Sequence, residues 1–171
     1  MLNSISDIQN LEADIAIRGC LEPPPQLIGR KIGAIPFCVC ASSTYIREHG
    51  LTHFPTAATL ADAVADVIVL DSSFKQAPFA QWFGEQIPPA ATVTTVNGFL
   101  AAWNLCKEGM GVTLLPEYLV NRTQSLQRLT TDSLPQANDL WILGHADFRD
   151  TERVRVVRQF LYDRLKPVFA V

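Results

Sequence analysis

The chain is short of charge and contains no long apolar run. Charged residues make up 18% of the 171 residues, and 14 basic against 17 acidic side chains leave a net charge of −3. A mildly acidic chain binds bare nucleic acid poorly, because that affinity rests mostly on neutralised phosphates. No stretch approaches the ~20 consecutive apolar residues of a membrane span. The opening residues lack the basic start and apolar run of a signal peptide. We therefore expect a cytoplasmic protein without a membrane partner.

Cysteine is scarce and forms no recognisable framework. The four cysteines are Cys20, Cys38, Cys40 and Cys106, and none of them belongs to a C-x-x-C pair. Cys38 and Cys40 stand two apart in an apolar run, so they share one face of a strand and are badly placed to bond each other. This usage predicts four reduced thiols. A cysteine redox switch is the alternative interpretation.

Motifs for catalysis or metal binding are also lacking. The sequence has no G-x-S-x-G, P-loop or G-x-G-x-x-G pattern. His49 and His53 are four apart, but Gly50 and Pro55 interrupt a helix there and no Glu or Cys completes a set of metal ligands. His145 has no acidic or nucleophilic neighbour at a recognisable spacing. We predict no catalytic residue, no metal and no cofactor; an α/β enzyme with an unrecognised site is a remaining alternative.

What the sequence does contain is an alternation of apolar strands and helices. Hydrophobic residues make up 48% of the chain, which excludes a disordered protein. The apolar runs predict strands near residues 14–18, 35–41, 67–70, 92–96, 112–115, 126–130 and 140–144. Helices are expected near 44–49, 59–65, 99–108, 116–121 and 151–166, with another after Pro78. Strands alternating with helices predict an α/β fold with a parallel sheet.

The last predicted helix is basic and amphipathic. Residues 150–166 hold five basic and three acidic side chains, which a solvated helix face explains better than contact with DNA. The apolar residues predicted to share its packed face are Val154, Val157, Phe160, Leu161 and Leu165.

Polar turns follow three of the predicted strands. They are Arg18-Gly19, Asp71-Ser72-Ser73 and Asn97-Gly98. In an α/β sheet, ligands bind at the carboxyl ends of strands. The last two turns precede helices, whose free N–H groups favour anions, and Asn97 is expected to cap its helix. Arg18 would add a positive charge for a carboxylate. Ordinary capping and a surface ion pair are the alternative reading of these residues.

Three stretches, in order, resemble the effector-binding domain of LysR-type transcriptional regulators. Residues 12–19, EADIAIRG, are similar to the family's D-[VIL]-A-[IF]-R strand. Residues 37–45, FCVCASSTY, with Gly50 and Pro55, resemble the strand that leaves the first lobe. Residues 109–119, GMGVTLLPEYL, look like G-x-G-[IV]-x-x-L-P-x-x-[LV]. The closing helix also fits, so the resemblance covers nearly the whole chain.

The resemblance implies a two-lobed, periplasmic-binding-protein-like (type II) fold. Lobe one would comprise residues 1–36 and 140–171, and lobe two residues 37–139, with strands near 35–41 and 140–144 as the hinge. Family members begin with a helix-turn-helix, a linker helix and the first strand and helix of lobe one. In this sequence, Met1 comes shortly before the strand predicted near residues 14–18, so we expect all of these elements to be absent. We therefore expect an incomplete lobe one with an exposed sheet edge. With the helix-turn-helix absent, no binding of operator DNA by this chain alone is expected.

The resemblance also implies a site and a function. The family's cleft positions carry over to Arg18, Gly19, Ser72, Ser73, Phe74, Asn97, Gly98 and Phe99. The phenylalanines would supply apolar walls and the turns hydrogen bonds. We expect a sensory domain, not an enzyme, that binds a small organic and anionic effector between the lobes and acts within a homo-oligomer. A free-standing small-molecule-binding module and a cysteine redox sensor are the alternatives.

Overall fold

The chain divides into two compact units. In the computed structural model, which describes residues 13–51, 53–54, 66–87, 89–148 and 151–169, unit 1 comprises Met1–Ile35 and Asn138–Val171, and unit 2 comprises Pro36–Ala137. The helix expected near 59–65 lies outside the described residues. Within the described ranges, no helix has both the length and the apolar character that crossing a membrane requires.

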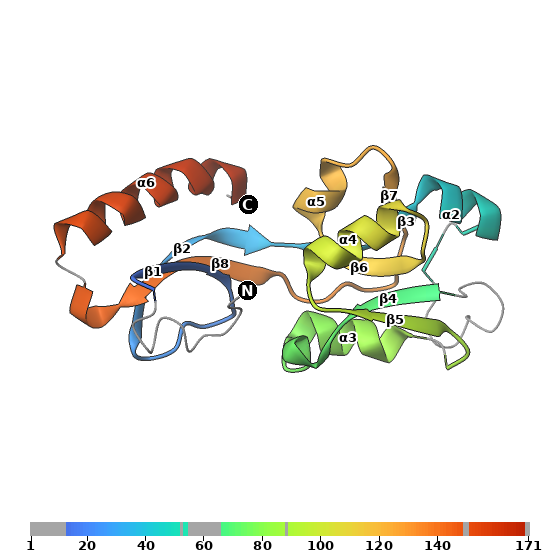
Figure 1. Ribbon diagram of the computed structural model, residues 1–171, viewed down its shortest axis with the longest axis horizontal. Coiled ribbons are helices and arrows are strands. Elements are labelled where there is room, and N and C mark those ends of the chain that lie inside the picture. Colours follow the sequence, from blue (N-terminus) through green and yellow to red (C-terminus); the bar gives the residue numbers. More distant parts are fainter. Residues whose placement is uncertain (1–12, 52, 55–65, 88, 149–150, 170–171) are drawn as a thin grey trace. The chain divides into compact units, whose positions relative to one another are not determined.

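Unit 1 is an antiparallel sheet with one long helix (Figure 1). Its strands are β1 (Ile15–Gly19), β2 (Leu27–Ile35) and β8 (Asn138–His145), in the order β1-β8-β2. A short 3₁₀ turn, η2 (Ala146–Phe148), precedes helix α6 (Glu152–Phe169). Among the described strands, β1 and β2 therefore form the two edges of this sheet.

Strand β2 was not predicted. The strand expected over 35–41 is confirmed for residues 37–41, which belong to β3, but it does not extend back to Ile35, where β2 ends. Pro36 stands between the two strands and has no N–H for a sheet ladder. Charged and glycine residues interrupt the apolar pattern of β2, whose sequence is LIGRKIGAI.

Helix α6 packs on the sheet of unit 1 through a face that matches the prediction in part: Val154 is buried, and Leu161 and Leu165 pack on the sheet. Val157 and Phe160 are 46% and 57% exposed, so their assignment to the packed face is wrong. The residues that pack against Ile32, Leu140 and Ile142 include Leu161, Tyr162, Leu165 and Phe169. At Gly33, a Cβ would stand 1.7 Å from the backbone oxygen of Phe169, so the backbones of β2 and of the end of α6 lie very close together. Only glycine lets the end of α6 approach β2 this closely.

Unit 2 is a layered α/β structure. Its strands are β3 (Phe37–Ser42), β4 (Asp66–Leu70), β5 (Thr92–Val96), β6 (Val112–Pro116) and β7 (Leu126–Arg128). Its helices are α2 (Ser43–His49), α3 (Pro78–Gln86), α4 (Phe99–Lys107) and α5 (Glu117–Asn121), with a 3₁₀ turn η1 (Ser72–Phe74). The sheet order is β5-β4-β6-β3-β7. Strand β4 is parallel to β5 and β6, whereas β3 is antiparallel to its neighbours, so the sheet is mixed.

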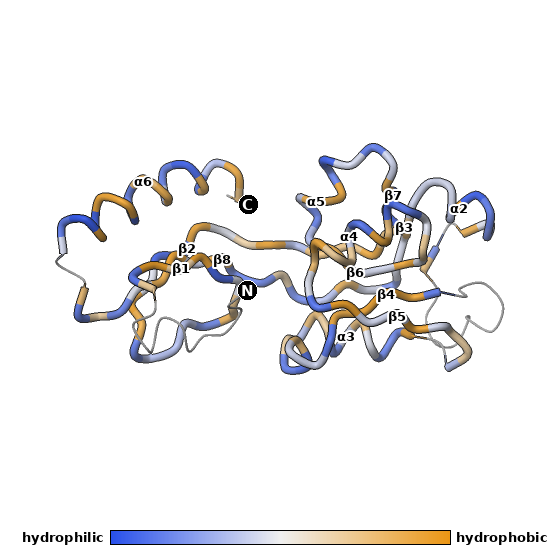
Figure 2. The backbone as a smooth tube through the Cα atoms, in the orientation of Figure 1, coloured by the Kyte–Doolittle hydropathy of each residue, from blue (hydrophilic) through white to orange (hydrophobic). Residues whose placement is uncertain are grey.

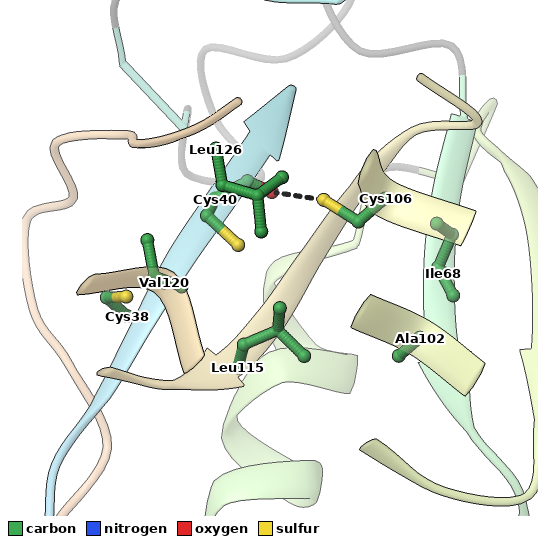
Figure 3. Close-up of a cluster of buried hydrophobic side chains, with 8 residues drawn as sticks. All are labelled: Cys38, Cys40, Ile68, Ala102, Cys106, Leu115, Val120 and Leu126. Carbon is green, nitrogen blue, oxygen red and sulfur yellow. Dashed lines mark hydrogen bonds between the residues drawn. The ribbon is translucent and has the colours of Figure 1, made fainter. Parts of the chain in front are cut away.

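The core of unit 2 lies between its sheet and helices α3 and α4, which cover opposite faces (Figure 1). Apolar residues concentrate along its strands, while α6 of unit 1 mixes apolar and polar residues (Figure 2). The cluster on the α4 side comprises Cys38, Cys40, Ile68, Ala102, Cys106, Leu115, Val120 and Leu126 (Figure 3). This packing holds the carboxyl ends of β4 and β5 in place.

Candidate functional site

Two polar turns of unit 2 lie side by side. Strands β4 and β5 are parallel and in register, with Leu70 opposite Val96. The backbone N–H of Asp71 donates to the carbonyl of Val96 at 2.8 Å, which ties the ends of the two strands together. The predicted residues of unit 2, which follow these strands, are therefore neighbours: Ser72, Ser73, Phe74, Asn97, Gly98 and Phe99.

The first turn is fixed by a capping carboxylate. Asp71 accepts hydrogen bonds from the backbone N–H of Ser73, at 2.9 Å, and from the Ser73 hydroxyl. These bonds hold the pKa of Asp71 below its usual range, so the carboxylate stays ionised at neutral pH. Ser72 and Ser73 are both exposed, and their turn presents polar groups to solvent.

The second turn differs from the prediction. Asn97 does not cap helix α4: Gly98 is the N-cap, in extended conformation, and no side chain bonds the first turn. The reason is geometric, since the helix begins one residue beyond the position that an Asn97 cap requires. The first turn of α4 consequently has no side-chain cap among the described residues, which is an arrangement that favours an anion. Asn97 is exposed beside them.

Four phenylalanine rings line the base of the two turns. Phe74 and Phe99, predicted as apolar walls, form an edge-to-face pair with ring centroids 5.8 Å apart. Phe37 and Phe79 complete the cluster: Phe79 stacks on Phe37 at 4.6 Å and lies 5.5 Å from Phe99. Sequence reasoning missed Phe37 and Phe79 as site residues, because an aromatic residue in an apolar strand or helix face indicates core. Offset and edge-to-face contacts of this kind stabilise such clusters beyond their buried area.

The remaining predicted residues belong to unit 1. Arg18 is half-buried on β1, opposite Trp141 of β8, and Gly19 is exposed at the end of the strand. The next backbone N–H, of Cys20, donates to the carbonyl of Asp139 at 2.9 Å. The structure thus brings six of the eight predicted residues together within unit 2 and places the other two next to each other on β1.

Three of the cysteines are buried thiols. Cys38, Cys40 and Cys106 lie in the core of unit 2, and the Cys106 thiol donates to the carbonyl of Cys40 at 3.6 Å (Figure 3). Burial raises the pKa of Cys38 to about 12. Burial also raises the pKa of the half-buried Cys20. Because oxidation proceeds through the thiolate, these environments favour structural thiols over a redox sensor.

The histidines have separate partners. Nδ1 of His49 lies 3.0 Å from the carbonyl of Tyr45, and Nδ1 of His53 lies 3.0 Å from the Thr130 hydroxyl. In the part of the chain that the structure describes, no group of three or more His, Cys, Asp or Glu side chains could hold a metal ion.

Comparison with known proteins assigns the fold. The model of the LysR substrate binding domain matches residues 2–166; a search of curated proteins gives no match. The CrgA regulatory domain from Neisseria meningitidis superposes with a TM-score of 0.74 at 21% identity, over 96% of this chain and 81% of that chain. The CcmR regulatory domain from Synechocystis PCC6803, in complex with 2-PG, superposes with a TM-score of 0.64 at 20% identity, over 96% of this chain and 77% of that chain.

The chain spans about half the length of a full-length regulator to which it is similar. Full-length AphB from Vibrio cholerae, a virulence activator, superposes with a TM-score of 0.65 at 21% identity, over 96% of this chain and 56% of that chain. LysR regulatory domains have the periplasmic-binding-protein-like type II fold, so the predicted fold class is confirmed. These domains are regulatory parts of transcription factors and not enzymes. With the family model matching nearly its whole length, the chain belongs to the LysR substrate-binding domain family.

Proposed function

We propose that this chain is the ligand-sensing domain of a LysR-type transcriptional regulator and that it binds a small organic acid. The observation that carries the proposal is the pair of adjoining turns in unit 2. They combine exposed hydroxyl and amide groups, the open N-terminus of α4 and an aromatic base. A few polar groups beside an apolar surface are typical of small-molecule sites.

An anionic group of the effector would lie at the N-terminus of α4, where backbone N–H groups and the helix dipole favour negative charge. Ser72, Ser73 and Asn97 would donate hydrogen bonds, and Phe74 and Phe99 would cover the apolar part. Arg18 and Gly19 would be the contribution of unit 1, with the guanidinium pairing the acid. The similarity to the CcmR regulatory domain, which is in complex with 2-PG, supports a small ligand for this fold.

Regulation would follow from differential binding. An effector shifts a conformational equilibrium only as far as it prefers one conformation over the other. In the regulator, that preference would be passed to DNA-binding helix-turn-helix domains of a homo-oligomer.

A thermal-shift screen tests the proposal. The probes are a panel of monocarboxylates, dicarboxylates and phosphorylated acids, including 2-PG. At least one should raise the melting temperature in a concentration-dependent way. Arg18→Ala should weaken its binding by about tenfold or more, since a charge-assisted hydrogen bond is worth roughly 1.5–3 kcal/mol.

Asn97→Ala is the matching variant in unit 2 and should also weaken binding. Arg155→Ala is the control, because the exposed Arg155 pairs only with its helical neighbour Glu152 among the described residues. A panel without a shift, or an equal loss of affinity in Arg155→Ala, would contradict the proposal.

A further inference from the structure

Unit 2 contains a cavity that borders the first of the paired turns and extends along α3. Its volume is about 520 Å³, and it lies between α3 and the sheet strands β4, β5 and β6. Ligand pockets measure roughly 300–1,000 Å³. We propose that this cavity is a second ligand site and that it binds an apolar organic acid, with an aromatic or branched aliphatic body and one acidic group.

The walls of the cavity are mainly apolar. Helix α3 contributes the rings of Phe79 and Phe83, which are buried, and the sheet contributes Val69, Val93 and Leu114. Val93 is 48% exposed although it stands on a strand that α3 faces. This part of the sheet therefore keeps apolar surface in contact with solvent, and an apolar ligand would gain by covering it.

The sequence of α3 keeps this space open. Ala80 and Gly84 are one helical turn apart and both line the cavity. No heavy atom lies within 4 Å of the position that a Cβ would take at Gly84. Glycine inside a helix lowers its stability relative to alanine, so Gly84 contributes space and not helical propensity.

The charged groups around the cavity orient a ligand. Lys75 is the cationic side chain among the lining residues, and no ion pair joins it to another described residue. Glu85, which also lines the cavity, stands in the last turn of α3, whereas Lys75 precedes the first turn of that helix. Asp71 also lines the cavity, but its carboxylate bonds Ser73. An acidic group would thus lie beside Lys75, and the apolar body would extend along α3, away from the turns.

The second site is distinct from the one in "Proposed function". The cavity shares Asp71 and Ser72 of the first turn and Phe79 of the aromatic base with that site, while its other lining residues lie outside the paired turns. The inference therefore does not depend on the proposed function.

The test uses 8-anilinonaphthalene-1-sulfonate, an aromatic probe with one sulfonate, on the whole chain. We expect one equivalent to bind with enhanced fluorescence. Gly84→Trp should fill the cavity and lower the affinity by about tenfold or more, whereas Gly84→Ala should leave it within about twofold. Lys75→Glu should lower the affinity by about threefold, because an exposed charge contributes little. Ala80→Leu fills the same space from the neighbouring turn and covers the case in which Gly84→Trp fails to fold.

Two controls separate this site from other surfaces. Phe160→Asp changes the exposed apolar face of α6, and Arg18→Ala changes the other proposed site; neither should alter binding of the probe. Binding that survives both Gly84→Trp and Ala80→Leu in folded protein would overturn the inference. So would a loss of binding in Phe160→Asp, which would assign the probe to α6.

Discussion

The two units of this chain bury their apolar residues very unequally. Of the 26 buried hydrophobic residues among those described, six lie in unit 1 and 20 in unit 2. Unit 2 has helices on both faces of its sheet, whereas α6 is the long helix that packs on the sheet of unit 1. Unit 1 also exposes large apolar side chains, including Ile17, Val156 and Phe160. Unit 2 therefore has a redundant core, whereas the stability of unit 1 depends on a few buried contacts.

The largest expected difference between the units is in thiol reactivity. Cys20 of unit 1 is half-buried, whereas the three cysteines of unit 2 are buried in its core. N-ethylmaleimide should modify Cys20 at least about 100-fold faster, since buried thiols react only after the core opens. Mass spectrometry of the native protein measures the four rates.

Cys20→Ser is the control for that measurement and should remove the fast phase. Fast modification of Cys38 or Cys106 in folded protein would break the comparison and would revive the redox-sensor interpretation.

Deleting a core side chain should have the next largest effect. Ile142 stands on the central strand of unit 1 and is 1% exposed. Ile142→Ala should cost about 2–5 kcal/mol of unfolding free energy, and unit 1 has few other buried residues to compensate. Hydrogen exchange should rise throughout β1, β2 and β8 while the amides of unit 2 stay protected.

The control is Val157→Ala, which truncates an exposed side chain of α6 and should change stability by less than about 0.5 kcal/mol. Loss of protection in both units together in Ile142→Ala would show that they unfold as one body and would end the comparison.

One glycine in each unit lies where two backbone segments approach closely, and replacing it tests that contact. At Gly111, φ is 137° and a Cβ would stand 2.6 Å from the carbonyl oxygen of Asp66, where α4 passes into β6. Gly111→Ala should therefore destabilise unit 2 by about 1–3 kcal/mol through backbone strain, with the contact adding to it. In unit 1, Gly33→Ala should push the end of α6 away from β2 and raise hydrogen exchange over residues 161–169.

Chemical denaturation measures the first variant and hydrogen exchange the second. Gly98→Ala is the matched control, because no heavy atom lies within 4 Å of its Cβ position and its backbone is extended. An unchanged denaturation midpoint in Gly111→Ala would show that the backbone between α4 and β6 does not require glycine at this position.

The smallest effect should come from a helix cap in unit 2. The Ser42 hydroxyl accepts from the backbone N–H of Tyr45 at 3.1 Å and caps α2. Ser42→Ala should cost about 1 kcal/mol and leave unit 2 folded, because its core is built elsewhere. The melting temperature measures the effect, with the exposed Thr44→Ala as control. A loss of folding in Ser42→Ala would show that the core of unit 2 is less redundant than its buried residues indicate.

The sequence predicted the part of the fold that carries the strongest local signals. Apolar runs located β4, β5 and β6, and polar residues directly after β4 and β5 identified the two turns. Because the carboxyl ends of parallel neighbours meet at one edge of a sheet, those turns could be expected to adjoin, and Leu70 stands opposite Val96.

What the sequence could not show depends on tertiary contacts. Strand β2 alternates poorly because Arg30 and Lys31 interrupt its apolar residues. Helical spacing alone did not separate Val154, Leu161 and Leu165, which are buried or pack on the sheet, from Val157 and Phe160, which are exposed. In the sequence, Phe37 has the pattern of an ordinary core residue, and only the structure shows that its ring contacts that of Phe99 beside the second turn.

Hydrogen exchange with and without a stabilising acid from the thermal-shift panel tests whether the paired turns of unit 2 bind the effector. If the effector binds the paired turns, saturation should slow exchange of the backbone amides at residues 72–75 and 99–102 and on β1 around Arg18, and leave α2 and α5 unchanged. Protection confined to other segments, or none at all at a concentration that raises the melting temperature, would contradict the assignment of these turns as the effector site.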